Sequence, residues 1–534
     1  MQRRDVLKSL TSTAAGLTIL KSGMLHGTTA PGNKLNIALI GVWGRGTAHY
    51  NSLRNENVVA LCDVNDLRTK EALRLFPGAK TYCDWRRCLE QKDVEAVVIC
   101  TADHHHAFIA NWALNRNMHV FCEKPLGISV EEVRAVRANY LKHKAKVATQ
   151  HGTQRHAFPN FERIRELILD GAIGELKVVH SWDSRQLPRP GYPEGQGSAP
   201  AVLHYEQWIG PSPHHPYSPQ YFGGSSGMNC IFWNMYRDFG LGQMGDMGAH
   251  TMDLVWNAVD AGAPIAIEAD HDVSDKYNPD ICPVKLKVHF SHPANQWRGP
   301  VELVWYQGGL KPESPKSYID MEKIGNGAVF EGTKGSILCD FTSRLIIPNN
   351  DDGDLTYYRR RSRQQLLPLV NGTGLPTQQS AGAKRVPASA GSGSPPLPPG
   401  FTAFPNAEPG PNGFPTIQYL ENGLPAALGL PNTDVDSILE AEKSGRLLNP
   451  DPFQLEWLAA CKGKFDGVIH GTSSKTHCDF DYAGALMEQM LLGLVAHRAG
   501  KKLNYDPTTG QITNAPETND YLKRQYRKDW TLDG

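Results

Sequence analysis

Lys124, Asp246 and His250 have the residue types and the spacing of a site that moves a proton and stabilises a developing negative charge. Lys124 stands in FCEKPL at 121–126, directly after an apolar segment, where a lysine is rarely buried unless it has a task. Asp246 and His250 stand in GQMGDMGAHTMD at 242–253, where a helix places positions i and i+4 on one face. The carboxylate can then orient the imidazole, which exchanges a proton near neutral pH.

Other interpretations of these residues stay open at this point. Lys124 could be a surface lysine at a strand end, and His250 a satisfied helix histidine. Asp246 and His250 could also hold a metal ion together with His104–His106, although we predict no metal site. Apart from that alternative, His104 and His105 are expected in an exposed loop.

A glycine-rich turn predicts a dinucleotide-binding loop. The apolar segment 35–40 runs into GVWGRG at 41–46, and a helix is expected to follow. This order places a pyrophosphate at the N-terminus of the helix. The pattern is GxxGxG, with a tryptophan where a second glycine usually stands. The loop residues expected at the cofactor are Gly41, Trp43, Gly44, Arg45 and Gly46.

Asp63 predicts which dinucleotide binds. It ends the second expected strand, 22 residues after Gly41, where an acidic side chain bonds the adenosine ribose hydroxyls. A carboxylate at this position repels a 2′-phosphate, so the sequence favours NAD over NADP. Arg68 is the nearby residue that argues for NADP.

Two patterns of elements must position these residues. From 35 to 152, apolar strand segments alternate with helical segments, which predicts an α/β, doubly wound parallel sheet of the Rossmann type. After 155 the strands are longer and predict an α+β domain on a large, mainly antiparallel sheet. The expected strands are 35–40, 58–63, 80–82, 96–101, 119–123 and 146–150 in the first part, and 176–184, 284–290, 301–306 and 336–340 in the second.

Domain limits follow from these patterns. We predict a dinucleotide-binding domain over 31–155 and an α+β substrate and oligomerisation domain over 156–534. A Pro/Gly-rich insertion with little regular structure is expected at about 365–432. Aromatic residues between 204 and 239 are interpreted as core or subunit-contact packing rather than as a surface that stacks on sugar rings.

Several short motifs resemble those of one oxidoreductase family. The GVWGRG turn, TADHHH at 101–106, EKPLG at 123–127, GTQRH at 152–156 and GDMGAH at 245–250 look like the glucose–fructose oxidoreductase / inositol dehydrogenase / MocA (Gfo/Idh/MocA) family. The C-terminal FDYAGALMEQMLLGLVAHRAGKKLNYD resembles a long-chain, exported bacterial branch of it. The resemblance covers about 35–345 and 451–530.

This resemblance implies roles for individual residues. Lys124 would lie beside the nicotinamide and hydrogen-bond the reacting hydroxyl, His250 would be the general base, and Asp246 would bind substrate. The Lys124–Pro125 peptide would be cis. The resemblance further implies cofactor contacts from Thr101, His106 and Glu123, and substrate contacts from Gln154 and Arg155.

The N-terminal segment predicts export. QRRDVLK at 2–8, a mildly apolar run and small residues up to Ala30 have the order of a twin-arginine signal peptide, here assigned to 1–30. A periplasmic protein that folds before export fits ten cysteines without a CxxC pair. The balance of 55 basic and 55 acidic residues gives no electrostatic reason to expect nucleic acid. No apolar segment after the leader is long enough for a permanent membrane span.

These observations predict an NAD(P)-dependent oxidoreductase that acts on the CH–OH group of a small-molecule sugar, cyclitol or glycoside. Free nucleotide is not expected outside the cytoplasm, so the cofactor should be tightly bound and reset in place. The first alternative is a redox-neutral, NAD-dependent glycosidase that oxidises, eliminates, hydrates and reduces its substrate. The second is a non-catalytic sugar-binding protein on the same scaffold. The resemblance also implies a homo-oligomer.

Overall fold

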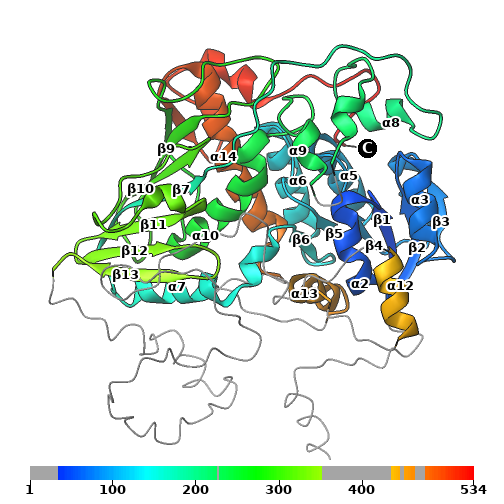
Figure 1. The fold of residues 1–534 in the computed structure, drawn as a ribbon, viewed down its shortest axis with the longest axis horizontal. Coiled ribbons are helices and arrows are strands. Elements are labelled where there is room, and N and C mark those ends of the chain that lie inside the picture. The colour runs from blue at the N-terminus through cyan, green and yellow to red at the C-terminus, as the bar shows by residue number, and fades with distance from the viewer. Residues whose placement is uncertain (1–33, 225–227, 351–434, 445–449, 464–475, 534) are drawn as a thin grey trace, which may run out of the picture. The chain divides into compact units, whose positions relative to one another are not determined.

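The computed structural model describes residues 34–224, 228–350, 435–444, 450–463 and 476–533 (Figure 1). The predicted signal peptide at 1–30 and the predicted insertion at about 365–432 lie outside the described residues. Both sheets belong to one compact unit, Leu35–Gly534. Within the described part of the chain, no helix is both long and apolar enough to cross a membrane.

The first sheet has six parallel strands in the order β3-β2-β1-β4-β5-β6, so the predicted Rossmann fold is confirmed. Its central strands are almost completely buried, as expected for strands covered on both faces. The strand order reverses between β1 and β4, and ligands bind beyond the carboxyl ends of strands at such a point. The strands are β1 (Asn36–Ile40), β2 (Asn57–Cys62), β3 (Lys80–Tyr82), β4 (Ala96–Ile99), β5 (His119–Cys122) and β6 (Thr149–His151).

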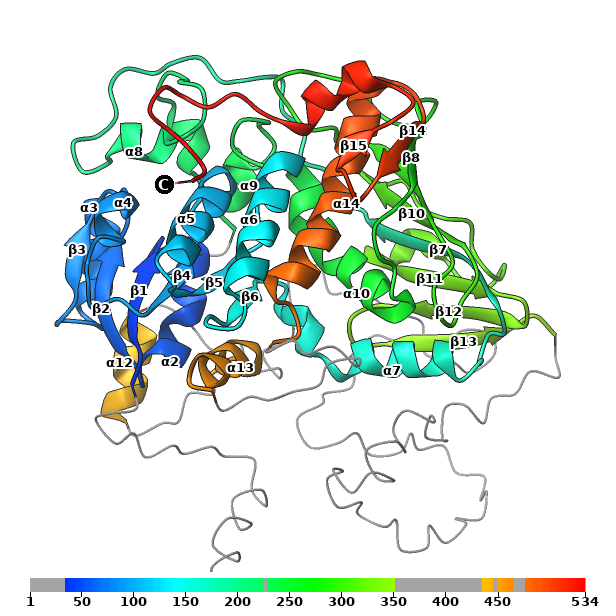
Figure 2. The same cartoon turned by 180° about the vertical axis from the view of Figure 1, so that it is seen from behind.

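The second sheet has nine strands in the order β13-β12-β11-β7-β10-β9-β8-β14-β15. Only β7 and β10 pair in parallel, so the predicted, mainly antiparallel sheet is confirmed. Helices α7 (Pro159–Leu169), α10 (Ala249–Val259) and α14 (Phe480–Ala499) lie on one side of it (Figure 2). Its strands are β7 (Leu176–Asp183), β8 (Ala266–Ala269), β9 (Leu286–His292), β10 (Val301–Gln307), β11 (Asn326–Gly332), β12 (Gly335–Cys339), β13 (Arg344–Pro348), β14 (Leu503–Asp506) and β15 (Gln511–Ile512).

Helix α14 joins the two sheets by packing against α6 (Val130–His143), which belongs to the Rossmann part. Arg134 of α6 donates a hydrogen bond to Glu488 Oε1 of α14 at 2.7 Å. Tyr140 of α6 donates to Asp479 Oδ2, at the N-cap of α14, at 2.9 Å. One continuous apolar core contains residues of both sheets. The carboxyl edge of the Rossmann sheet is therefore held at a fixed distance from α10.

The helix expected over 242–253 forms, and it includes a π-helical turn, Met244–Gly248, before α10. One expectation about local structure is wrong. His104 and His105 are not in an exposed loop, because they lie in α5 (Asp103–Asn115) and are almost completely buried. The sequence predicts free thiols rather than disulfides, and all ten cysteines are indeed free.

Candidate active site

A cavity of about 350 Å³ opens at the carboxyl edge of the Rossmann sheet. It brings together residues predicted from five separate motifs and from the end of the second strand. The predicted residues that line it are Gly41, Trp43, Arg45, Asp63, Thr101, His106, Glu123, Lys124, Gln154, Arg155, Asp246 and His250. Gly44 and Gly46 do not line the cavity but shape the loop behind it.

The glycines of the loop are required by close backbone packing. A Cβ on Gly41 would lie 2.5 Å from the Cys100 carbonyl group at the end of β4, and Gly41 has a φ of +84°. A Cβ on Gly46 would lie 2.0 Å from the Gly41 carbonyl oxygen. The helix that follows begins as a 3-10 helix, Gly44–His49, and becomes α-helical only in α2 (Tyr50–Leu53). The loop can therefore present bare backbone to a ligand.

Asp63 stands at the rim of the cavity and holds the loop. Its carboxylate accepts hydrogen bonds from the backbone N–H groups of Val42 and Asn65, each at 2.9 Å. Burial raises the pKa of Asp63. Arg68 also lines the cavity, and its guanidinium stacks over the Trp43 ring at 4.0 Å. Trp43, in the position usually held by a glycine, thus forms a wall together with Arg68.

Lys124 and Asp246 meet on the floor of the cavity. Lys124 Nζ donates a hydrogen bond to Asp246 Oδ1, and Arg185 donates to Asp246 Oδ2 at 2.5 Å. Burial alone would raise the pKa of Asp246, but Lys124 and Arg185 lower it to about 2. Burial alone would likewise lower the pKa of Lys124, but Asp246 raises it. The lysine is therefore an ammonium group at neutral pH. The Lys124–Pro125 peptide is cis, as expected.

His250 lies in the first turn of α10 with only 4% of its surface exposed. Burial, then the positive charges of Arg155 and Lys124, hold the pKa of His250 well below its ordinary value. The imidazole is therefore neutral. Its Nδ1 is buried without a hydrogen-bond partner among the described residues. The expectation that Asp246 orients His250 is wrong, because Asp246 instead bonds Lys124 and Arg185.

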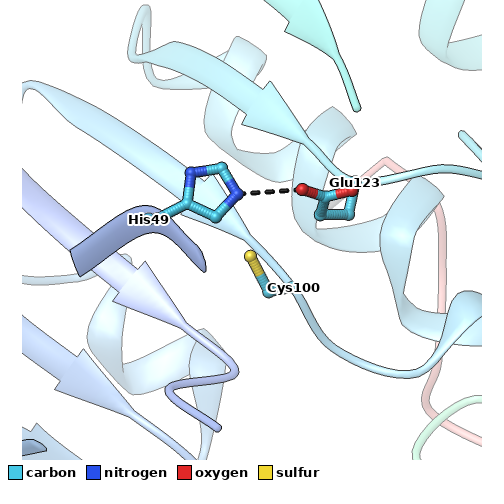
Figure 3. A group of neighbouring side chains, drawn as sticks. All are labelled: His49, Cys100 and Glu123. Carbon is cyan, nitrogen blue, oxygen red and sulfur yellow. Dashed lines mark hydrogen bonds and ion pairs between the residues drawn. The ribbon is translucent and has the colours of Figure 1, made fainter. Parts of the chain in front are cut away.

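Glu123 lies in a small cluster of side chains with His49 and Cys100 (Figure 3). Its Oε1 accepts hydrogen bonds from Arg45 Nε and His49 Nε2, each at 2.9 Å. Burial alone would raise the pKa of Glu123, but Arg45 and His49 lower it to about 2. Together with Cys100 these groups have the spacing of metal ligands. The guanidinium of Arg45 repels a cation, so the cluster is better explained as a charge pair that fixes the loop against β5.

The alternative metal site of the sequence interpretation does not form. His104 and His105 each place Nε2 at 2.8 Å from the Trp208 carbonyl oxygen. The ring nitrogens of His106 lie 2.6 Å from the Pro125 carbonyl oxygen and 3.0 Å from that of Thr101. These three histidines therefore bond backbone rather than joining Asp246 and His250.

Two family models match the two parts that build this cavity. The model described as oxidoreductase family, NAD-binding Rossmann fold, matches residues 35–151. The model described as oxidoreductase family, C-terminal alpha/beta domain, matches residues 193–294. Both are models of the Gfo/Idh/MocA family. Residues 35–151 and 193–294 therefore match this family. The match reaches into both walls of the cavity and includes Lys124, Asp246 and His250.

Individual relatives match a smaller part of the chain. Inositol 2-dehydrogenase of Salmonella typhimurium is 31% identical over 176 residues, which is 32% of this chain and 52% of the relative. Myo-inositol 2-dehydrogenase of Thermotoga maritima is 28% identical over 160 residues, 29% of this chain and 47% of the relative. The chain thus spans about half the length of the curated relatives it matches. The WlbA dehydrogenase of Chromobacterium violaceum, solved with NADH and UDP-GlcNAcA, shares the fold with a TM-score of 0.51 at 11% identity, covering 89% of this chain and 97% of that one.

The structure adds residues that sequence reasoning missed. Arg185 lines the cavity two positions after β7 ends, and a strand-end rule could have identified it. Asp103, the first residue of α5, also lines the cavity, and burial raises its pKa well above the ordinary value. Asn229 lies against the glycine-rich loop, since a Cβ on Gly44 would be 2.5 Å from its Oδ1. Cys230 stands next to it in the same wall. No local pattern identifies either of these two residues.

The aromatic residues between 204 and 239 mostly form a buried cluster, as expected. Trp208 stacks near Tyr205 and Phe239, and Tyr221 packs edge-on against Tyr236. The edge of this cluster nevertheless reaches the cavity. The aromatic residues that line it there are Trp208, Tyr221, Phe222 and Trp233.

Proposed function

We propose that the protein is an NAD(P)-dependent oxidoreductase that acts on a CH–OH group of a sugar, cyclitol or glycoside. The observation that carries this proposal is the convergence of Lys124, Asp246 and His250 on one cavity beside the glycine-rich loop. The two relatives, both inositol dehydrogenases, support the same substrate class.

The residues around the loop fit a dinucleotide. The close packing of Gly41 and Gly46 allows backbone N–H groups to approach a pyrophosphate. The Asp63 carboxylate stands at the rim, where it can accept hydrogen bonds from ribose hydroxyls. NAD, when bound, accepts a hydride at C4 of its nicotinamide ring.

Each of the three converging side chains has its own role in the reaction. His250 removes the hydroxyl proton with its neutral imidazole, and because Nδ1 is buried, Nε2 is the nitrogen that accepts it. Lys124 donates a hydrogen bond to the same oxygen and stabilises its negative charge while the C–H bond breaks. Asp246 keeps Lys124 protonated, and together with Arg185 it can bind neighbouring hydroxyls.

Asp63 should set the preference for NAD. Asp63→Asn keeps the size of the side chain but removes the charge that repels a 2′-phosphate. We expect the ratio of kcat/KM for NAD to that for NADP, each added to cofactor-stripped protein, to fall about 10-fold. Asp93→Asn, which changes an exposed carboxylate at the opposite end of the sheet, serves as the control. An unchanged ratio in Asp63→Asn would contradict this role.

We further propose that the cofactor stays bound and is recycled in place, in an exported homo-oligomer. The twin-arginine pattern at 1–30 supports export of a folded protein. Leu203, Gln207 and Trp208 support retention, because they line the cavity from a segment outside the Rossmann part.

The test combines native mass spectrometry with absorbance spectroscopy. Native mass spectrometry of protein purified without added cofactor should show one dinucleotide per chain. A panel of sugars, cyclitols and aryl glycosides should then produce the NADH absorbance band in that protein. Aryl-glycoside cleavage without a lasting NADH band would indicate the redox-neutral glycosidase instead. Absence of nucleotide, and of any signal after NAD is added, would favour the non-catalytic sugar-binding protein.

A further inference from the structure

Residues 200–212, here called the cover, attach directly to the rim of the cofactor cavity. Asn65 and Leu203 form an antiparallel β-bridge. Asp66 N donates to the Val202 carbonyl oxygen at 2.9 Å, and His204 N donates to the Val64 carbonyl oxygen at 2.8 Å. These bonds begin one residue after Asp63. The cover therefore lies over the end of the cavity where the adenosine ribose is expected.

Two histidines hold the cover from the Rossmann side. His104 and His105 of α5 both bond the Trp208 carbonyl oxygen in α8 (Tyr205–Ile209), the helix of the cover. Trp85 donates to His105 Nδ1 at 3.2 Å, so the proton of His105 is on Nε2 and is donated to that carbonyl. The fit is close, because a Cβ on Gly210 would lie 2.0 Å from His105 Cε1.

The C-terminal segment 523–533, here called the tail, holds the cover from outside. Arg527 donates through its backbone N to the Pro211 carbonyl oxygen at 3.0 Å, and through its guanidinium to Glu206 Oε2 at 2.8 Å. Arg524 donates to Ser212 Oγ and to the His104 carbonyl oxygen, each at 3.0 Å. The same two arginines therefore bond the cover, and Arg524 also bonds α5.

The tail is itself anchored on the Rossmann part. Trp530 packs against the rings of Trp85 and Phe108. Asn111 and Asn115 of α5 donate to the carbonyl oxygens of Leu532 and Asp533, each at 2.7 Å. Figure 2 shows this segment in red beside α5 and α8. The tail thus bridges α5 of the Rossmann part and α8 of the cover.

We propose that the tail and the histidine pair form a clasp that keeps the cover closed over the adenosine end of the cavity, so that a bound dinucleotide leaves only when the clasp opens. This inference rests on the proposed dinucleotide site. Most of the bonds in the clasp are polar, between side chains and backbone carbonyl groups. Such bonds can break without exposing a large apolar core, so the clasp sets a rate of exchange rather than the stability of the fold.

The test measures the exchange of protein-bound NAD for isotopically labelled NAD by native mass spectrometry. Arg527→Ala removes the bond to Glu206, and Glu206→Gln weakens the same bond from the other side. Both residues are partly exposed, with 29% and 61% of their side chains accessible, so both variants should fold. We expect exchange to become about 10-fold faster in Arg527→Ala, since hydrogen bonds between charged groups are the strong ones. Glu206→Gln should also make exchange faster, but by a smaller factor.

Arg137→Ala is the matched control, because it removes an ion pair of similar length, 2.7 Å to Asp481, away from the cover. It should exchange NAD at the wild-type rate. If wild-type protein retains NAD and both clasp variants exchange it at the same rate, the clasp is refuted and the proposed function stands. If wild-type protein retains no NAD even after loading, the clasp and the proposed site are refuted together.

Discussion

Lys124→Met should lower turnover about 10³-fold while the dinucleotide stays bound. Methionine keeps the length and the apolar stem of lysine but cannot donate a hydrogen bond to the reacting oxygen. Asp246 retains Arg185 as a partner, so the substitution does not leave an unpaired buried carboxylate. The loss should therefore appear in kcat and not in cofactor content.

The measurement is single-turnover NADH formation in holoprotein, with bound NAD quantified by native mass spectrometry. Lys311→Met is the control, because Lys311 is also largely buried, with 7% of its side chain exposed, but bonds the Met321 carbonyl oxygen outside the cavity. It should change stability more than turnover. Full turnover in Lys124→Met would remove the lysine from the mechanism.

His250→Gln should lower kcat/KM by about 10²- to 10⁴-fold, the range for loss of a general base. The pH dependence gives a second, independent readout. Burial and nearby cations hold the pKa of His250 well below the ordinary 6.5, so the active neutral form persists as the pH falls. Wild-type kcat/KM should therefore stay level through pH 6.5 and decrease only at markedly lower pH.

His143→Gln is the matched control, since His143 lies in the last turn of α6 and does not line the cavity. It should leave both the rate and the pH profile unchanged. An acid limb centred at the ordinary histidine pKa would show that His250 titrates as a solvated group, and the assignment as a buried base would then be wrong.

Local motifs on strand ends were predictable from the sequence. The glycine loop, Asp63 and Lys124 each follow an apolar strand, and parallel strands bring their carboxyl ends to one edge. Asp246 and His250 were identified by type and spacing. Their expected partnership was wrong, because Lys124 and Arg185 bond the carboxylate instead.

Contacts between distant segments were not predictable in the same way. His104 and His105 are polar residues in a polar run, so local composition placed them at the surface. They are buried because the Trp208 carbonyl oxygen, more than 100 positions later in the chain, accepts hydrogen bonds from both imidazoles. Arg524 and Arg527 carry no motif at all, and their partners lie more than 300 positions away. Such pairings depend on the assembled fold and leave no periodic signal.

The connection between Asn111 and Leu532 spans 421 positions of chain, and this sets an order of events during biogenesis. The ribosome completes α5 and the glycine loop long before it makes the segment that ties the cover down. Until then the bonds of Arg524 and Arg527 to the cover cannot form, so under the proposed clasp the cleft is still open. The clasp can form once residues 523–533 have been made. With the dinucleotide and the export that we propose, loading should therefore precede export.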